Sequence, residues 1–198
     1  IYLVPEIGLT PQVVKAVQKE LIGKWNQLKK LVNVNQLKKK TNLNSNIADN
    51  IKSIFNYAGV TDISGIEKKI GAYLSCFKKS ETVKTDTKNL LTWVIIVRHI
   101  SNEQIPLVEK FDIVNLDALT KALNMILFRN EDMNEALTKT LNKFGIKFVI
   151  EEKLDKVPVD GYSFWEGDNP TIVLTKRHDR IDNFGFTLMH ELGHICLH

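Results

Sequence analysis

The sequence has few cysteines and no long apolar run, and both shortages limit what the protein can be. Its 198 residues include only Cys76 and Cys196, which form no CxxC pair. Two isolated cysteines are typical of reduced core residues in a cytoplasmic protein and argue against a disulfide framework. The most apolar run, residues 93–97, is too short to cross a bilayer, so the sequence predicts no transmembrane helix.

The start of the chain, IYLVPEIGLTPQ, lacks the basic and apolar regions of a signal peptide and does not begin with Met. We therefore expect a cytoplasmic protein, and we expect this chain to be a fragment of a longer one. Hydrophobic residues make up 43% and charged residues 25% of the sequence, which is ordinary for a globular protein. The length suits one domain with an extension or two small domains.

Positive charge is concentrated in the first half of the chain. Residues 1–100 hold 16 Lys and Arg against 7 Asp and Glu, whereas residues 101–198 hold 11 against 16. Such an asymmetry can indicate proximity to nucleic acid, but a solvated helical surface explains the same pattern. We favour the second interpretation because no aromatic RNA-binding motif accompanies the lysines.

Apolar residues in the first half recur at helical spacing and predict an all-helical segment with its own core. Thr10 is a suitable N-cap, Pro11 fits the first helical position, and Asp86 is the expected cap of a later helix. Pro106 and the acidic stretch after it indicate a boundary, so we expect the first domain to cover residues 1–113. The expected helices lie at residues 11–32, 47–58, 66–74 and 87–97.

The pattern changes in residues 114–198, the second expected domain. Turn-forming residues at 166–170 separate two short apolar strands and predict a hairpin. We expect an α+β fold, in which the helical segment precedes a small domain with a three-stranded antiparallel sheet. Its expected elements are helices at 116–128 and 132–144, strands at 146–150, 159–165 and 171–175, and a final helix after Asp182.

The final helix contains the sequence His190-Glu191-Leu192-Gly193-His194. Residues four apart project from one face of a helix, so His190 and His194 can present two imidazoles to one metal ion. Glu191 lies one step round the helix, within reach of a water on that metal without being a ligand. Zinc lowers the pKa of such a water toward about 7, so a carboxylate can take its proton. The motif predicts zinc-dependent peptide hydrolysis with Glu191 as the base.

The remaining histidines and two carboxylates are weaker candidates. His198 lies about 12 Å along the helix from the first motif histidine, too far to share its metal. His178 is either a substrate contact or a surface histidine, and we take His99, in the helical half, as unrelated. Glu151 and Glu152 are candidate third ligands.

Two further interpretations of the motif stay open. The helix can carry a degenerate site that performs no hydrolysis, or two histidines that coincide with the pattern. Gly193 does not distinguish between these interpretations. A glycine inside a helix lowers the stability of the helix by about 1 kcal/mol relative to Ala. That cost suggests close approach of another group at this position, or packing alone.

The stretch YSFWEGDNPTIVLTKRHDRIDNFGFTLMHELGHICLH resembles the ImmA/IrrE family of zinc metallopeptidase-like domains. The closest likeness is to the version fused behind an N-terminal helix-turn-helix in HigA-type antitoxins and phage-like repressors. A weaker likeness to the helical linker of such fusions extends upstream to about residue 46. Gly185 departs from the pattern, because these fusions often carry Trp there. The matching positions are Phe164-Trp165, Asn169-Pro170, Ile172-Val173-Leu174, Arg177, Asp182, Phe184 and Phe186-Thr187-Leu188.

The resemblance implies a zinc cofactor, with His190 and His194 as ligands and Glu191 as catalytic base. The family's third ligand is a Glu from the next helix, which would follow His198, so the two histidines alone should hold zinc weakly. The resemblance also implies a cytoplasmic regulator that contacts DNA through a domain preceding Ile1 and has no membrane partner. A homodimer would suit a palindromic operator.

The family implies two different functions. In one, the domain cleaves a partner repressor and relieves repression. In the other, the protein is an antitoxin that binds DNA and a cognate toxin, and the peptidase fold is a non-catalytic sensor or scaffold. For a protein substrate, an edge strand would hold the extended chain by strand addition. We place that role on residues 171–175, where a proline at 173 should abolish cleavage.

Overall fold

The computed structural model describes residues 10–77, 85–104, 107, 109–129, 132–175 and 181–197. The chain divides into two compact units. The first, here called the helical unit, comprises Ile1–His99 with Leu154–Val157, and the second, the sheet unit, comprises Ile100–Lys153 with Pro158–His198. The expected domain boundary after residue 113 stays a prediction. None of the described helices combines the length and the apolar character needed to cross a bilayer.

The expected helices of the first half are confirmed, and the helical unit contains one more short helix between the first two. Its buried side chains include Leu28, Leu37, Ile54 and Ile66, so several helices contribute to its interior. The helices are α1 (Pro11–Leu31), α2 (Val34–Lys40), α3 (Ile47–Ala58), α4 (Ile63–Phe77) and α5 (Thr87–Glu103), of which α5 continues into the sheet unit.

The apolar stripe of α1 is buried at one end only. Leu28 is fully buried, but Val13 and Val17 are 43% and 46% exposed. The expectation that this whole stripe belongs to a core is therefore wrong for the first turns of the helix. Helical spacing predicts which residues share a face, but it does not tell how far along the helix that face has a partner.

Side chains cap several helices of this unit, including one of the two caps expected from the sequence. Asn46 accepts hydrogen bonds from the first turn of α3, and Asp86 accepts one from the backbone nitrogen of Asn89 (3.0 Å), which confirms the expected cap of α5. Thr10 occupies the N-cap position of α1 without a side-chain bond. The backbone nitrogen of Asp86 also donates to the carbonyl of Lys156 (3.0 Å), so the loop segment Leu154–Val157 is held within the helical unit.

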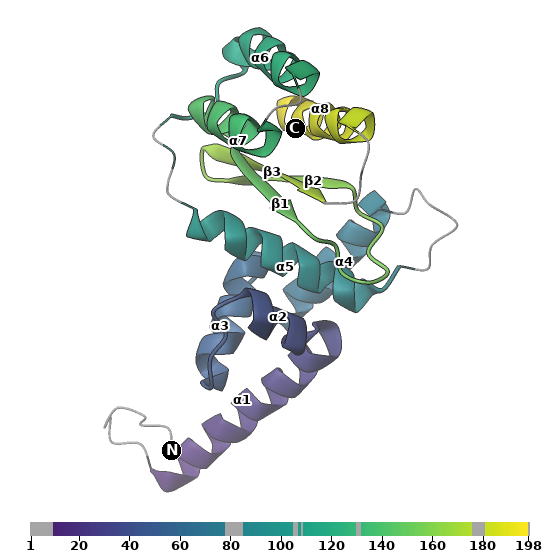
Figure 1. Cartoon of the computed structure of the whole chain (residues 1–198). Helices are drawn as coiled ribbons and strands as arrows, with labels where there is room; N and C mark the ends of the chain where they lie inside the picture. Colours follow the sequence, from purple (N-terminus) through teal and green to yellow (C-terminus); the bar gives the residue numbers. More distant parts are fainter. Residues whose placement is uncertain are drawn as a thin grey trace. The chain divides into compact units, whose positions relative to one another are not determined.

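In the sheet unit, three strands lie beneath a layer of helices (Figure 1). The strand order is β1-β3-β2; the helices α7 and α8 cover one face of the sheet, and α6 lies on the outer side of this layer. The predicted helices, strands and hairpin are all confirmed. The elements are η1 (Ile113–Asn115), α6 (Leu116–Arg129), α7 (Met133–Lys143), β1 (Lys147–Glu151), β2 (Gly161–Glu166), β3 (Asn169–Thr175) and α8 (Ile181–Leu197).

The sheet is mixed, so the expectation of a purely antiparallel sheet is wrong. β2 and β3 form the predicted antiparallel hairpin, but β1 pairs in parallel with β3. The connection between β1 and β2 carries the chain past β3, so β3 becomes the central strand. The expected substrate-binding role of residues 171–175 is wrong for the same reason, because both sides of β3 are already paired with strands.

Central placement explains the burial of β3, in which every residue from Pro170 to Thr175 is buried. Because side chains alternate along a strand, Ile172 and Leu174 point to the helical layer, and Phe148 of β1 lies beside Ile172 on that face. These residues form one core with the inner faces of the helices. The other core members are Leu119, Leu123, Leu137, Leu141, Ile146, Leu188, Leu192 and Ile195.

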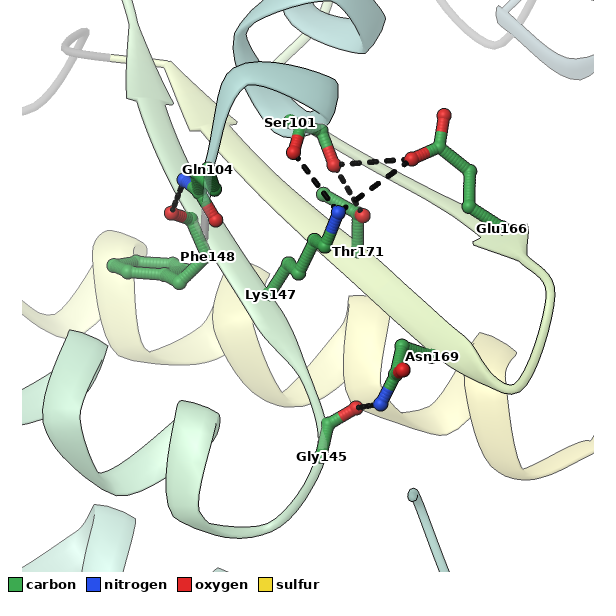
Figure 2. Close-up of polar contacts among 8 residues, drawn as sticks. All are labelled: Ser101, Gln104, Gly145, Lys147, Phe148, Glu166, Asn169 and Thr171. Atoms are coloured by element: carbon green, nitrogen blue, oxygen red, sulfur yellow. Dashed lines mark hydrogen bonds and ion pairs between the residues drawn. The ribbon is translucent and has the colours of Figure 1, made fainter. Parts of the chain in front are cut away.

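Polar side chains make contacts on part of the opposite face, where the end of α5 meets the sheet (Figure 2). Lys147 of β1 donates to the backbone carbonyl of Ser101 (3.0 Å) and lies 4.0 Å from a carboxylate oxygen of Glu166. The Ser101 hydroxyl is 2.8 Å from that of Thr171, and Gln104 donates to a backbone carbonyl of β1 (2.9 Å). These contacts with β1 and β3 hold the end of α5 on the sheet.

A tight turn at Gly145 leads from α7 into β1. Gly145 has φ +77°, and a Cβ at this position would lie 2.8 Å from the carbonyl oxygen of Lys110 and closer still to the next backbone nitrogen. Asn169 holds the same place from the hairpin side, because its side-chain nitrogen donates to the carbonyls of Gly145 and Glu109, both at 2.8 Å (Figure 2). Only glycine satisfies both the left-handed backbone and the close approach.

We predict that Gly145→Ala destabilises the protein by about 3 kcal/mol or more, because neither backbone segment can yield easily. Gly167→Ala is the matched control. Gly167 also has positive φ (+63°) but no atom within 4 Å of an added Cβ, so it should cost only the left-handed penalty of about 1–2 kcal/mol. Urea unfolding of both variants measures the difference, and equal losses would show that the close approach at Gly145 contributes nothing.

Candidate metal and peptidase site

Helix α8 presents the two motif histidines on its exposed face. Leu188, Leu192 and Ile195 of the same helix are buried against the sheet and so fix the orientation of the helix. His190 and His194 are exposed, and their Nε2 atoms lie 3.1 Å apart. The ring of Phe186, one turn earlier, is stacked beside the His190 ring with centroids 6.2 Å apart. The two imidazoles therefore converge on one point outside the helix.

This separation fits two ligands of one metal ion. Two nitrogens bound tetrahedrally to zinc, each at about 2.0–2.1 Å, are about 3.3 Å apart. A hydrogen bond between the two rings would bring the nitrogens to the same distance of 3.1 Å, so the distance is compatible with a metal site but does not require one. Neutral imidazole nitrogens are ligands that zinc accepts readily, so the pair could hold such an ion.

Glu191 is almost completely buried, with 6% of its surface exposed, although it sits between two exposed histidines. The hydroxyl of Ser163 on β2 donates to its Oε2 atom at 2.9 Å. Burial raises the pKa of the Glu191 carboxyl above its usual range, while the Ser163 bond and the charges of His194 and His190 act in the opposite direction. The carboxyl is thus held in one place and is made more basic than an exposed one.

Gly161, two residues before Ser163 on β2, lies even closer to Glu191. A Cβ on Gly161 would be 2.7 Å from both Cγ and Oε1 of Glu191 and 2.7 Å from Cγ2 of Thr187. The strand can therefore approach α8 closely only because residue 161 has no side chain. Gly161 and Ser163 point to the same face of the sheet, since strand side chains alternate.

The other residues considered from the sequence do not join this group in the described part of the chain. Arg177, His178 and His198 lie outside the described residues. Glu151 and Glu152 end β1, and no cluster of three or more His, Cys, Asp or Glu side chains able to hold a metal ion is found among the described residues. The structure thus brings together His190, His194 and Glu191 without a third protein ligand from its described residues.

Gly193 has more room than its position in the helix suggested. No described atom lies within 4 Å of where its Cβ would be, so the expected close approach is not found there. Gly185, by contrast, is approached by Leu127 of α6, whose Cδ1 would lie 3.1 Å from an added Cβ. The side chain of Leu127 therefore occupies space that a Trp at position 185 would need.

A comparison with protein families matches residues 141–198 to a peptidase family described as the IrrE N-terminal-like domain. Residues 141–198 form an ImmA/IrrE-family domain. The matched region begins near the end of α7 and includes the whole sheet and the described part of α8, so it contains the histidine pair, Glu191 and Ser163. Comparisons with curated proteins and with solved structures gave no match.

Two residues of the ImmA/IrrE-like site were missed from the sequence, namely Gly161 and Ser163. The sequence GYSFWE predicts a strand, but it does not say which face of the strand meets the final helix. Their spacing of two residues is the signal that was present, because it places a glycine and a hydroxyl on one face. The partner helix became known only with the fold.

We predict that Gly193→Ala stabilises the protein by up to about 1 kcal/mol, because Ala favours the helix and nothing described obstructs its Cβ. Gly185→Ala in the same helix is the matched control, and its gain should be smaller because Leu127 must move. Thermal or urea unfolding of residues 1–198 measures both. A loss of stability in Gly193→Ala would contradict the conclusion that the position of its Cβ is unobstructed.

Proposed function

We propose that the ImmA/IrrE-like domain is a zinc metallopeptidase of a transcription regulator that hydrolyses a peptide bond in a partner repressor. His190 and His194 are the two zinc ligands on α8, and Glu191 is the catalytic base. The observation that supports this most directly is the convergence of the two Nε2 atoms at 3.1 Å beside a buried, hydrogen-bonded carboxyl. The family match of residues 141–198 supports the peptidase class.

Each side chain has a distinct task in this reaction. When bound, zinc supplies Lewis acidity that acidifies water and polarises a peptide carbonyl. His190 and His194 would hold that ion from successive turns of one helix face. Glu191 takes a proton from the attacking water and delivers it to the leaving amine.

The strand β2 is the element that we assign to substrate binding. It lies at an edge of the sheet and packs directly on Glu191 through Ser163. In a two-residue hairpin the residues flanking the turn form a hydrogen-bonded pair, and such pairs alternate along the ladder. Residues 162, 164 and 166 therefore bond to β3, and the backbone groups of residues 161, 163 and 165 point outward. An extended substrate can add there as a further strand.

The second candidate function is a HigA-type antitoxin or repressor that binds DNA and a cognate toxin, with the peptidase fold as a scaffold. It is supported by the family match of residues 141–198, which gives the domain class and does not require catalysis. In that case DNA binding would come from a further domain, and a homodimer would suit a palindromic operator. The two candidate functions differ in whether they require Glu191, since only the peptidase needs it as a base.

We predict that Glu191→Gln abolishes cleavage of fluorescein-labelled casein by the native protein with zinc, while zinc binding is retained. The amide keeps the size of the carboxyl but cannot accept the proton.

His190→Ala or His194→Ala should each weaken zinc binding at least tenfold, measured by calorimetry on residues 1–198. Glu152→Gln, at an exposed carboxyl, is the control and should change neither. Cleavage that survives Glu191→Gln would contradict the role of Glu191 as the base, whereas a wild-type protein that cleaves nothing would leave the scaffold function.

We predict that Trp165→Pro lowers cleavage at least tenfold without unfolding the protein. Proline removes an outward backbone N–H, which an edge strand tolerates but an added substrate strand requires. Trp165→Ala is the matched control, since it removes the same ring and its contact with Phe111 but keeps the N–H. Equal activity of the two variants would contradict substrate binding along β2.

A further inference from the structure

The contact between β2 and Glu191 involves two residues on one face of the strand. Ser163 donates its hydroxyl to Oε2 of Glu191 (2.9 Å), and Gly161 lies so close that an added Cβ would be 2.7 Å from Oε1 and Cγ. One oxygen of the carboxylate is thus bonded to the strand, and the other lies beside the glycine. Neither residue projects from α8 or touches the histidine pair in any contact that the structure shows.

A glutamate side chain has three rotatable bonds and can place its carboxylate in many positions. Burial to 6% exposure limits these positions, but apolar packing alone does not distinguish one oxygen from the other. A hydrogen bond to Oε2 does, because it occupies one acceptor site of that oxygen, whereas no hydrogen bond from the described residues of β2 to Oε1 is seen. Because Gly161 has no side chain, the Glu191 side chain can occupy the space beside the strand in this orientation.

We propose that Gly161 and Ser163 form a cradle on β2 that positions the Glu191 carboxylate beside the histidine pair. Ser163 acts by holding Oε2, and Gly161 acts by leaving the space that the side chain occupies. Both are positioning residues, since they act through Glu191. This inference rests on the proposed function, in which Glu191 is the base, but the contact itself can be tested without any catalysis.

A purely structural role would have a different signature. A serine that only satisfies a buried carboxyl stabilises the fold, and its loss should lower stability and leave the turnover of the folded enzyme unchanged. A positioning residue must in addition change kcat, because a misplaced catalytic group can cost about 100-fold in rate. KM should stay the same, since β2 keeps its outward backbone groups.

The first experiment is a double-mutant cycle on residues 1–198 without metal, measured by urea unfolding. Ser163→Ala should raise the unfolding equilibrium constant roughly tenfold or more in the wild-type background, as expected for the loss of a bond to a charged group. In a Glu191→Ala background the same change should have less than about a twofold effect. Equal effects in both backgrounds would overturn the cradle, because the hydroxyl would then not act on Glu191.

Gly161→Ala is a second variant in the same cycle. Its Cβ meets Thr187 in both backgrounds but meets Glu191 only in the wild type, so it should cost less when residue 191 is alanine. Gly193→Ala, which has no neighbour within 4 Å, is the control and should show no dependence on residue 191. A Gly161→Ala effect that is independent of residue 191 would overturn the part assigned to Gly161.

The second experiment measures kcat and KM for fluorescein-labelled casein in the native protein with zinc. Ser163→Ala should lower kcat about 10- to 100-fold with KM within about twofold, and Ser163→Thr, which keeps the hydroxyl, should restore most of kcat. An unchanged kcat in Ser163→Ala would overturn the positioning role. If the wild-type protein cleaves nothing, the proposed peptidase function fails, and the double-mutant cycle still decides whether the cradle holds Glu191.

Discussion

Helix α8 must bury Glu191 and expose the histidines on either side of it, and the site depends on this constraint. At 3.6 residues per turn, His190 and His194 lie about 40° apart around the helix, and Glu191 lies about 60° beyond His194. The buried residues Leu188, Leu192 and Ile195 occupy the next part of the circumference. Glu191 therefore stands at the border between the exposed and the buried face, where a carboxyl can touch the sheet and still lie beside the histidines.

This helix and the hairpin could be predicted from the sequence, but the order of the strands in the sheet and the direction of β1 could not. The apolar period and the motif spacing determine which residues share a face of α8, and the turn residues at 166–169 determine the pairing of β2 with β3. The alternation in β1 is the same for a parallel or an antiparallel partner. The run PTIVLT is consistent with the burial of β3 on both faces, which is typical of a central strand, but a strand next to a tight turn can equally lie at the edge of a sheet.

Four glycines illustrate why the site was only partly predictable. Gly145 and Gly161 are required by backbone or side chains that come from distant parts of the sequence, Gly185 makes room for Leu127, and Gly193 has open surroundings. The sequence does not distinguish these four roles, because the residue type alone does not tell which atoms lie near a glycine in the folded protein. The departure at Gly185 from the usual Trp also becomes understandable only through α6, which lies outside the matched region. Local patterns therefore locate the motif, whereas the support of Glu191 depends on tertiary contacts.

Ser163 connects the two parts of the proposed reaction, because its side chain faces Glu191 and its backbone groups face the outer edge of β2. A substrate strand on that edge would be aligned by the same residue that holds the base. The register of the hairpin then matters for chemistry as well as for folding. A slip of one residue would turn Ser163 away from α8 and bring Tyr162 or Phe164 against Glu191, since strand side chains alternate. The two-residue turn at Gly167 and Asp168, which sets this register, is consequently as much a determinant of the site as the motif on α8.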